Sequence, residues 1–223
     1  MAVVTRGDEE IRKDVLDQLH RDGRVDASGI SVEVSDARVV LTGTVSTYSA
    51  RTRAEEDAWM VVGVDTVDNQ LTVKYPADVP VPTDEEIESN VVNTLRWQTD
   101  VDLADVEVAV KGGRVTLKGS VDFYWKKVWI EEITGGLPGV THVTNELAVV
   151  PSHAFDDLAI AEEIEGALER NLREDAEKVD VKVEDGVVTL TGHVPHIAAL
   201  HAARDVARHT PGVVSIVNKL AIG

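Results

Sequence analysis

The sequence predicts an α+β fold made of three tandem domains, each with the element order α-β-β-α-β. Two observations support this prediction. A short strand pattern, with alternating apolar residues around a glycine, occurs at Leu41–Val45, Leu117–Val121 and Leu190–Val194. Around each of these glycines the same residue types return at the same distances, without a gap. The chain is therefore one unit of about 66 residues written three times.

Each unit opens with an amphipathic helix. Its apolar residues are spaced four apart, so they form one stripe along the helix. Acidic residues begin the helix of the first unit, at the positive end of the helix dipole, and Thr83 and Glu86 form a capping box in the second unit. The stripes are Ile11, Val15 and Leu19; Ile87, Val91 and Leu95; and Ile160, Ile164 and Leu168.

Two strands joined by a short turn follow each first helix. Apolar residues alternate with polar ones, which indicates half-buried strands, and the turns at 35–38, 111–114 and 184–186 indicate antiparallel hairpins. A second helix and a third strand complete the unit, and their crossover should be right-handed. Each unit is thus expected to form a small three-stranded mixed sheet with two helices on one face. The second helices are expected over about 47–62, 122–136 and 195–209.

Three domains follow from this repeat, over residues 8–73, 84–149 and 157–222. The first linker, residues 74–82, holds three prolines and is expected to be extended and semi-rigid. The second linker, residues 150–156, is shorter. Because units of this size bury only about 60% of their unfolded surface, each is marginally stable alone, and docking between units is expected.

Nine repeated positions are expected to serve the architecture. The glycine within the second strand removes a side chain where a helix lies close, and a later glycine ends the second helix as a C-cap. The asparagine in the inner row of the third strand needs partners for its amide. It either bonds nearby backbone or contacts a ligand or cation three times over. These positions are Gly43, Gly119 and Gly192; Gly63, Gly139 and Gly212; and Asn69, Asn145 and Asn218.

The chain is strongly acidic, with a net charge of −18 from 40 acidic and 22 basic residues. Such a surface repels nucleic-acid phosphates and anionic lipids and attracts cations and basic partners. There is no cysteine, which excludes disulfides and thiolate metal sites. The sequence shows no signal peptide and no apolar stretch that could span a membrane. A cytoplasmic location is expected, or a periplasmic one where a leader has been removed.

The sequence lacks the patterns that would indicate an enzyme. Acidic runs such as Glu55–Asp57 are expected to be solvated helix faces, and no nucleophile, nucleotide-binding or zinc-protease motif occurs. The third unit holds four of the seven histidines, but His196 and His201 do not share a helix face, and surface positions are expected. The identity of any metal ligands stays open. No cofactor is expected, with a monovalent or divalent cation as the alternative.

The second helix of the second unit departs most from its counterparts. Trp125 and Trp129 are one turn apart and share a face that lies off the apolar stripe of the helix. Two interpretations stay open: the helix is a hub onto which the other units dock, or it carries an exposed contact patch. The candidate binding residues are Phe123, Tyr124, Trp125, Lys126, Lys127 and Trp129.

With these motifs in hand, the chain resembles the BON-domain family of bacterial osmotically induced and nodulation proteins, over nearly its whole length. The resemblance rests on the Leu-x-Gly-x-Val strand, on Pro-Gly-Val at Pro138–Val140 and Pro211–Val213, and on the closing Asn-x-Leu. In the first unit Val62–Val64 replaces Pro-Gly-Val. The family resemblance implies two helices on one face of a three-stranded mixed sheet, and it supplies no catalytic motif.

The resemblance also implies a non-catalytic role. Members are linked to osmotic and envelope stress, to membranes or phospholipids, and in a cytoplasmic relative to potassium. Most are exported, whereas this chain is acidic and shows no export signal. We therefore expect a stress-response or binding protein that presents surfaces to a protein partner or small ligand. The alternatives are cation sensing and weak association with a membrane surface. No nucleic-acid partner is expected.

Overall fold

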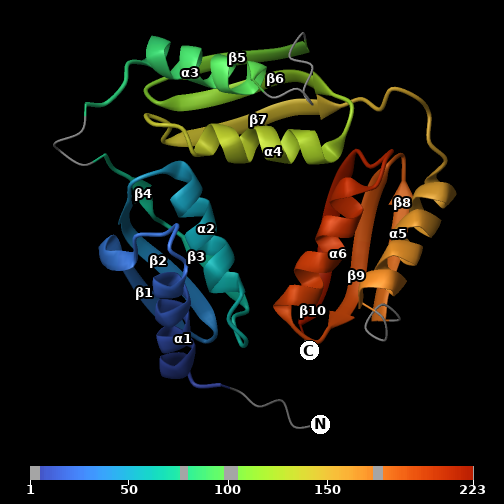
Figure 1. The fold of residues 1–223 in the computed structure, drawn as a ribbon. Coiled ribbons are helices and arrows are strands. Elements are labelled where there is room, and N and C mark those ends of the chain that lie inside the picture. Colours follow the sequence, from blue (N-terminus) through green and yellow to red (C-terminus); the bar gives the residue numbers. More distant parts are fainter. Residues whose placement is uncertain (1–5, 76–79, 98–104, 173–177, 223) are drawn as a thin grey trace. The chain divides into compact units, whose positions relative to one another are not determined.

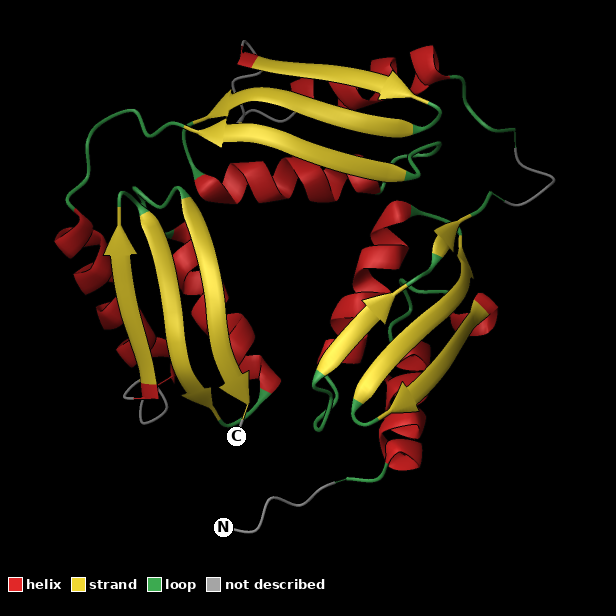
Figure 2. Ribbon diagram, turned by 180° about the vertical axis from the view of Figure 1, so that it is seen from behind, coloured by secondary structure: helices red, strands yellow, loops and turns green. Residues whose placement is uncertain are grey.

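The computed structural model describes residues 6–75, 80–97, 105–172 and 178–222, and within them each repeat has the order α-β-β-α-β (Figure 1). Each repeat forms its own mixed sheet with two helices on one face, as the view of the open sheet faces in Figure 2 shows. This confirms the fold class that the sequence predicts. Part of the expected first linker, residues 76–79, lies outside the described residues.

The three repeats contain the following elements. Repeat one contains α1 (Asp8–Arg21), the short 3-10 helix η1 (Ala27–Gly29), β1 (Ile30–Ser35), β2 (Arg38–Val45), α2 (Tyr48–Trp59), β3 (Thr66–Asn69) and β4 (Thr72–Val73). Repeat two contains α3 (Asp84–Arg96), β5 (Val106–Lys111), β6 (Arg114–Val121), α4 (Tyr124–Gly135) and β7 (His142–Val149). Repeat three contains α5 (Asp157–Leu172), β8 (Val179–Glu184), β9 (Val187–Val194), α6 (Ile197–His209) and β10 (Ser215–Ile222).

The second strand of each repeat lies in the middle of its sheet. In repeat one β2 pairs with β1 antiparallel and with β3 parallel, so that Leu41 lies opposite Val32 on one side and Asn69 on the other. In repeat three β9 pairs with β8 antiparallel and with β10 parallel. The parallel pair requires the chain to cross over the sheet, and the second helix makes that crossing.

The core of each repeat lies between the helices and the central strand. In repeat one the α1 stripe is at most 1% exposed and packs with Val39 and Leu41 of β2, which are fully buried. Three inward positions of α2 are alanines, which let this helix lie close to its neighbours, and α6 has alanines at the same places. Each fully buried Leu or Ile contributes roughly 1.5–3 kcal/mol to stability.

The third strand of repeat one differs from the prediction of one strand over 67–73. It is divided into β3 and β4, which both pair with β2. The guanidinium of Arg51 explains the break, because it donates to the carbonyl oxygens of Asn69 at 2.9 Å and Leu71 at 3.0 Å. Lys127 and Leu200 hold this position in the other repeats, where the strand is continuous.

Glycine is required in the central strand for a different reason from the one predicted. A Cβ atom at Gly43 would lie on the carbonyl oxygen of Gly29, the residue that leads into β1, and not against a helix. Gly119 and Gly192 meet the carbonyls of Asp105 and Lys178 in the same way. All three have φ between +113° and +120°, which side chains rarely allow. Close backbone approach therefore demands glycine here.

The later glycine was expected to end the second helix, and this was wrong. The helix α2 already ends at Trp59, and Gly63 lies in the turn that follows it, with φ of +96°. A Cβ atom at Gly63 would lie 3.2 Å from Cδ1 of Ile11, and one at Gly212 would lie 2.8 Å from Cδ1 of Ile160. These glycines make room for the first apolar residue of the first helix.

A carboxylate joins the first helix of each repeat to the hairpin of the same repeat. In repeat two, Asp84 Oδ2 accepts from the backbone N–H of Gly112 at 2.7 Å, and Oδ1 accepts from Gly113 at 2.9 Å. Asp8 and Asp157 accept from the matching turns at 2.8–3.1 Å. From the sequence the acids of the first unit are expected only to interact favourably with the helix dipole. The structure adds a tertiary role, because they satisfy two turn N–H groups each.

The Asp84 carboxylate makes repeat two sensitive to acid. Its hydrogen bonds from Gly113 and Gly112 hold its pKa below the ordinary value of 3.8. Because the folded pKa is lowered, the stabilisation is present above about 3.8 and is lost as pH falls through the folded pKa. We expect Asp84→Asn to lower the stability of repeat two at pH 7 and to remove this part of its acid dependence. Hydrogen exchange over α3 and the 111–114 turn measures both effects.

Glu85→Gln is the matched control for Asp84→Asn. It removes the same charge from the same helix turn, but Glu85 is exposed, and within the described residues no hydrogen bond joins it to the hairpin. Equal losses of protection in the two variants would mean that interaction with the helix dipole alone explains the stabilising effect of Asp84.

The second residue of the hairpin turn in repeat one carries backbone strain that the matching residue avoids in the other repeats. Ala37 has φ of +61°, where repeats two and three have Gly113 and Gly186 at φ of +72°. A residue with a side chain in this left-handed region costs about 1–2 kcal/mol of stability. Glycine avoids that cost but loses more conformational entropy on folding, so the net gain is smaller. We expect Ala37→Gly to stabilise repeat one by roughly 0.5–1 kcal/mol in chemical denaturation. Ser35→Gly, in extended strand, should destabilise it, and stabilisation by both changes would contradict the strain argument.

Candidate functional site

The residues predicted as a binding site lie together at the start of α4 and are called the aromatic surface here. They are Phe123, Tyr124, Trp125, Lys126, Lys127 and Trp129, and all of them are partly exposed. The Trp125 ring lies 6.5 Å from the Phe123 ring and 6.5 Å from the Trp129 ring, the latter edge to face. Helical spacing brings Trp125 and Trp129 together, and Phe123, just before α4, adds a third ring to the cluster.

Lys126 is bound within this cluster. Its ammonium lies 2.7 Å from Asp122 Oδ1 and 5.2 Å and 5.7 Å from the ring centres of Phe123 and Trp125. Its side chain is only 13% exposed. Comparison of the repeats explains the low exposure of Lys126. It occupies the inward position that Ala50 and Ala199 hold in the other repeats, where they are 4% and 1% exposed. The stem therefore lies inward and the charge reaches out to Asp122 and the rings.

The repeated asparagine bonds its own repeat in the first two cases. Asn69 Nδ2 donates to the carbonyl of Arg51 at 2.8 Å and to Glu55 at 3.0 Å, and its Oδ1 accepts from the N–H of Leu71 at 3.1 Å. Asn145 makes the same three bonds in repeat two. The amide therefore ties the second helix to the third strand, which supports the structural interpretation of this position.

Repeat three lacks most of these hydrogen bonds. Asn218 accepts from the N–H of Leu220 at 3.1 Å, but it is exposed, and Arg204 replaces the glutamate partner. In repeats one and two that partner is Glu55 or Glu131. The three copies of the asparagine are therefore not equivalent, and a ligand contact made identically three times is not supported.

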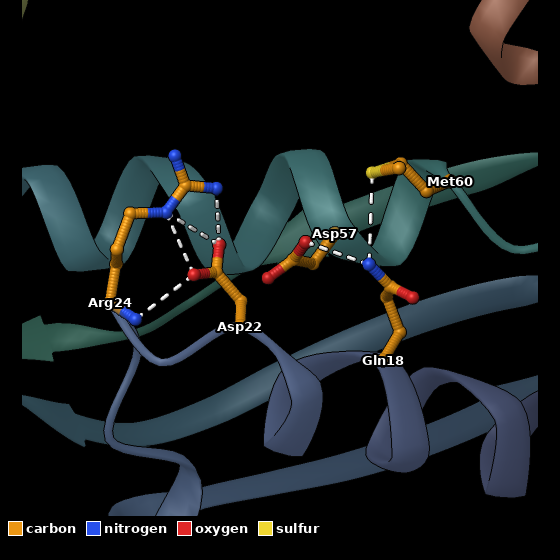
Figure 3. Close-up of polar contacts among 5 residues, drawn as sticks. All are labelled: Gln18, Asp22, Arg24, Asp57 and Met60. Atoms are coloured by element: carbon orange, nitrogen blue, oxygen red, sulfur yellow. Dashed lines mark hydrogen bonds and ion pairs between the residues drawn. The ribbon is translucent and has the colours of Figure 1, made fainter.

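Repeat one contains a buried carboxylate that the sequence pattern hides. The run Glu55–Asp57 is expected to be a solvated face; Glu56 is exposed, but Asp57 is 4% exposed. Figure 3 shows its Oδ1 accepting from Gln18 Nε2, at 3.2 Å, while Gln18 also lies 3.8 Å from the sulfur of Met60. Comparison of the repeats could have found it, because Ile133 and Val206 hold this position elsewhere.

A second carboxylate lies beside this network. Asp22 accepts from Arg24 through the guanidinium, at 2.7 Å and 2.8 Å, and through the backbone N–H at 2.9 Å (Figure 3). These bonds lower the pKa of Asp22 from 3.8 to about 2. Burial raises the pKa of Asp57, and the bond from Gln18 partly opposes that rise.

The structure offers no metal centre within its described residues, where no three His, Asp or Glu side chains converge. Two histidines of repeat three serve local structure instead. His196 caps α6 by accepting from the N–H of Ala199 at 3.1 Å, and His209 Nδ1 lies 2.8 Å from the carbonyl of Asp205. None of the helices in the described ranges is long and apolar enough to cross a membrane.

Comparison with known proteins places all three repeats in one family. The family model described as "BON domain" matches residues 7–75, 83–151 and 156–223. No curated protein matches the chain.

Two solved structures match over nearly the whole chain, both of CdsD, described as a structural protein of the type III secretion system of Chlamydia trachomatis. The structure of its C-terminal domain is 10% identical, covers 95% of this chain and 96% of that one, and has a TM-score of 0.27. The other is 11% identical, covers 96% and 92%, and has a TM-score of 0.24. At these TM-scores the likeness supports no inference about this chain.

The unequal asparagines lead to a direct test. Asn145→Ala removes three hydrogen bonds and leaves the N–H of Leu147 without its partner, so we expect repeat two to lose about 1–3 kcal/mol of stability. Asn218→Ala removes one bond from an exposed residue, and we expect repeat three to lose roughly 0.5 kcal/mol or less. Repeat-resolved hydrogen exchange in denaturant measures both losses. Equal losses would show that the tie does not stabilise repeat two.

Proposed function

Because the chain belongs to the BON-domain family, with three such domains in tandem, we propose that it is a non-catalytic binding protein whose partner contacts the aromatic surface of α4. BON domains are binding domains linked to stress responses and to membrane association. No catalytic family matches the chain. A binding role is therefore the class of function that the family supports.

The ring cluster of Phe123, Trp125 and Trp129 is the observation that favours this surface. Aromatic side chains contribute large contact area at a small entropic cost, and they are enriched among the residues that dominate binding energy. The corresponding positions are Thr47, Ser49 and Arg53 in repeat one and His196, Ala198 and Ala202 in repeat three. The fold does not require these rings, since two other repeats form it without them.

The charge of the surface favours a protein partner over a lipid membrane. Lys126 is already neutralised by Asp122 and engaged by two rings, so Lys127 is the cation that remains for a partner to meet. The chain carries a net charge of −18, which opposes approach to an anionic membrane. A partner protein with an apolar contact and a hydrogen-bond acceptor for Lys127 fits this surface best.

Cation sensing stays an alternative prediction with less support. Net negative charge attracts cations in general, but a specific site needs several oxygen ligands aimed at one point. The side-chain amide oxygens of Asn69 and Asn145 already accept from backbone N–H groups. The cytoplasmic location expected from the sequence also stays a prediction.

The proposal is tested by Trp125→Ala combined with Trp129→Ala. For a contact surface we expect the free energy of unfolding to change by roughly 0.5 kcal/mol or less per site. Affinity for the partner should fall at least about tenfold, as for residues that dominate an interface. The partner is sought by capture from cell extract on the immobilised chain, and binding is then measured with the purified protein. Vesicles of zwitterionic or anionic lipid test the membrane alternative.

Trp97→Ala is the matched control. Trp97 lies just beyond α3 in the same repeat, is 85% exposed and lies outside the cluster. It should leave both stability and capture unchanged. A loss of roughly 3–5 kcal/mol for each removed tryptophan would show that Trp125 and Trp129 serve packing and not partner binding. Capture that is equal for wild type and double variant would also reject this surface.

A further inference from the structure

The buried carboxylate of Asp57 has one oxygen that the fold leaves without a partner. Its Oδ1 accepts from Gln18, but its Oδ2 is completely buried and has no hydrogen-bond partner among the described residues. Figure 3 shows this second oxygen directed away from Gln18, along α2. An ionised carboxylate loses much of its hydration when buried, and one amide bond replaces only part of that loss.

The fold itself does not require an acid at this position. Ile133 and Val206 hold it in the other two repeats, and the neighbouring inward residues of α2, Ala54 and Ala58, are fully buried. An apolar side chain therefore fits between the two helices. Repeat one carries instead a group that can exist in two charge states.

The charges facing Asp57 come from both helices and from the loop after α1. Asp22, at the end of α1, and Glu56, on α2, favour the protonated form of Asp57, whereas Arg24 favours the ionised form. Arg24 donates three side-chain hydrogen bonds to Asp22, and Arg53 also interacts with Asp22. The negative charge of Asp22 therefore balances much of the positive charge near Asp57. The surroundings offset only part of the cost of burying a negative charge.

We propose that Asp57 is a proton-binding site, and that uptake of a proton there tightens the packing of α2 on α1 in repeat one. The ligand is the proton itself, and Oδ2 is the atom that receives it, since Oδ1 is occupied by Gln18. When Asp57 is ionised, Oδ2 is satisfied only by water, which must enter between the helices. That entry opens the contact of Gln18 with Asp57 and Met60.

The direction of the pH effect follows from burial. The pKa of Asp57 in the folded chain lies above its ordinary value of 3.8, mainly because burial disfavours the charge. The stabilisation is therefore complete below about 3.8 and is lost as pH rises through the folded pKa. Asp22, Asp26 and Asp68 have lowered pKa values, so their stabilisation is lost only below about 3.8. The two effects occupy different pH ranges, and among these four carboxylates only Asp57 tightens repeat one on mild acidification.

Carboxyl NMR and hydrogen exchange on the full chain test this site. We expect the side-chain carboxyl of Asp57 to titrate above 3.8 in the wild-type protein. Amide protection over α1 and α2, corrected for intrinsic exchange, should rise by up to about tenfold per pH unit lowered between the folded pKa and about 4, the limit for one proton. Protection over α5 and α6 reports the change that is common to all repeats.

Variants separate this site from general charge effects. Asp57→Asn keeps the shape and removes the titration, so its α1 and α2 protection should lose the specific pH dependence. Asp57→Val copies repeat three and should raise protection at neutral pH. Glu56→Gln removes a neighbouring exposed charge and should retain most of the wild-type change of α1 and α2 protection with pH. The proposal would be overturned by a pKa of 3.8 or below for the Asp57 carboxyl. It would also be overturned if α1 and α2 protection changed with pH in Asp57→Asn as steeply as in wild type.

Discussion

Each repeat depends on the burial of one apolar row from its first helix against the central strand of its sheet. The stripe of α1 and the inner residues of β2 are almost fully buried, and repeat three has the same core built from the same positions. Units of about 66 residues have little other apolar surface to bury. The alanines and turn glycines matter because they let both helices lie close enough to complete this small core.

Polar ties then fix how the elements meet. The first-turn aspartate holds the hairpin turn to the first helix, and the asparagine holds the third strand to the second helix in repeats one and two. Both ties satisfy backbone groups that the sheet ladder leaves open, so each adds specificity as well as stability. At Asn218, where only one of these bonds remains, the residue is exposed.

The places where the repeats differ are the places that suggest function. Three copies of one fold show which residues the architecture needs, and the rings of α4 and the carboxylate of Asp57 are not among them. The rings form a cluster suited to contact, whereas Asp57 introduces a charge into a site that its counterparts fill with apolar side chains. One feature points outward to a partner, and the other links the stability of repeat one to pH.

The sequence alone determined the three α-β-β-α-β repeats, because apolar spacing and repeated glycines depend on local geometry that each segment carries by itself. It also indicated the aromatic surface, since Trp125 and Trp129 share a helix face. The tertiary structure decided what those positions contact. Gly43 lies against the carbonyl oxygen of Gly29, the residue before β1. Asp84 accepts from the hairpin turn, and Asp57 accepts from a side chain on α1. Such contacts join residues far apart in the chain, and no periodicity records them.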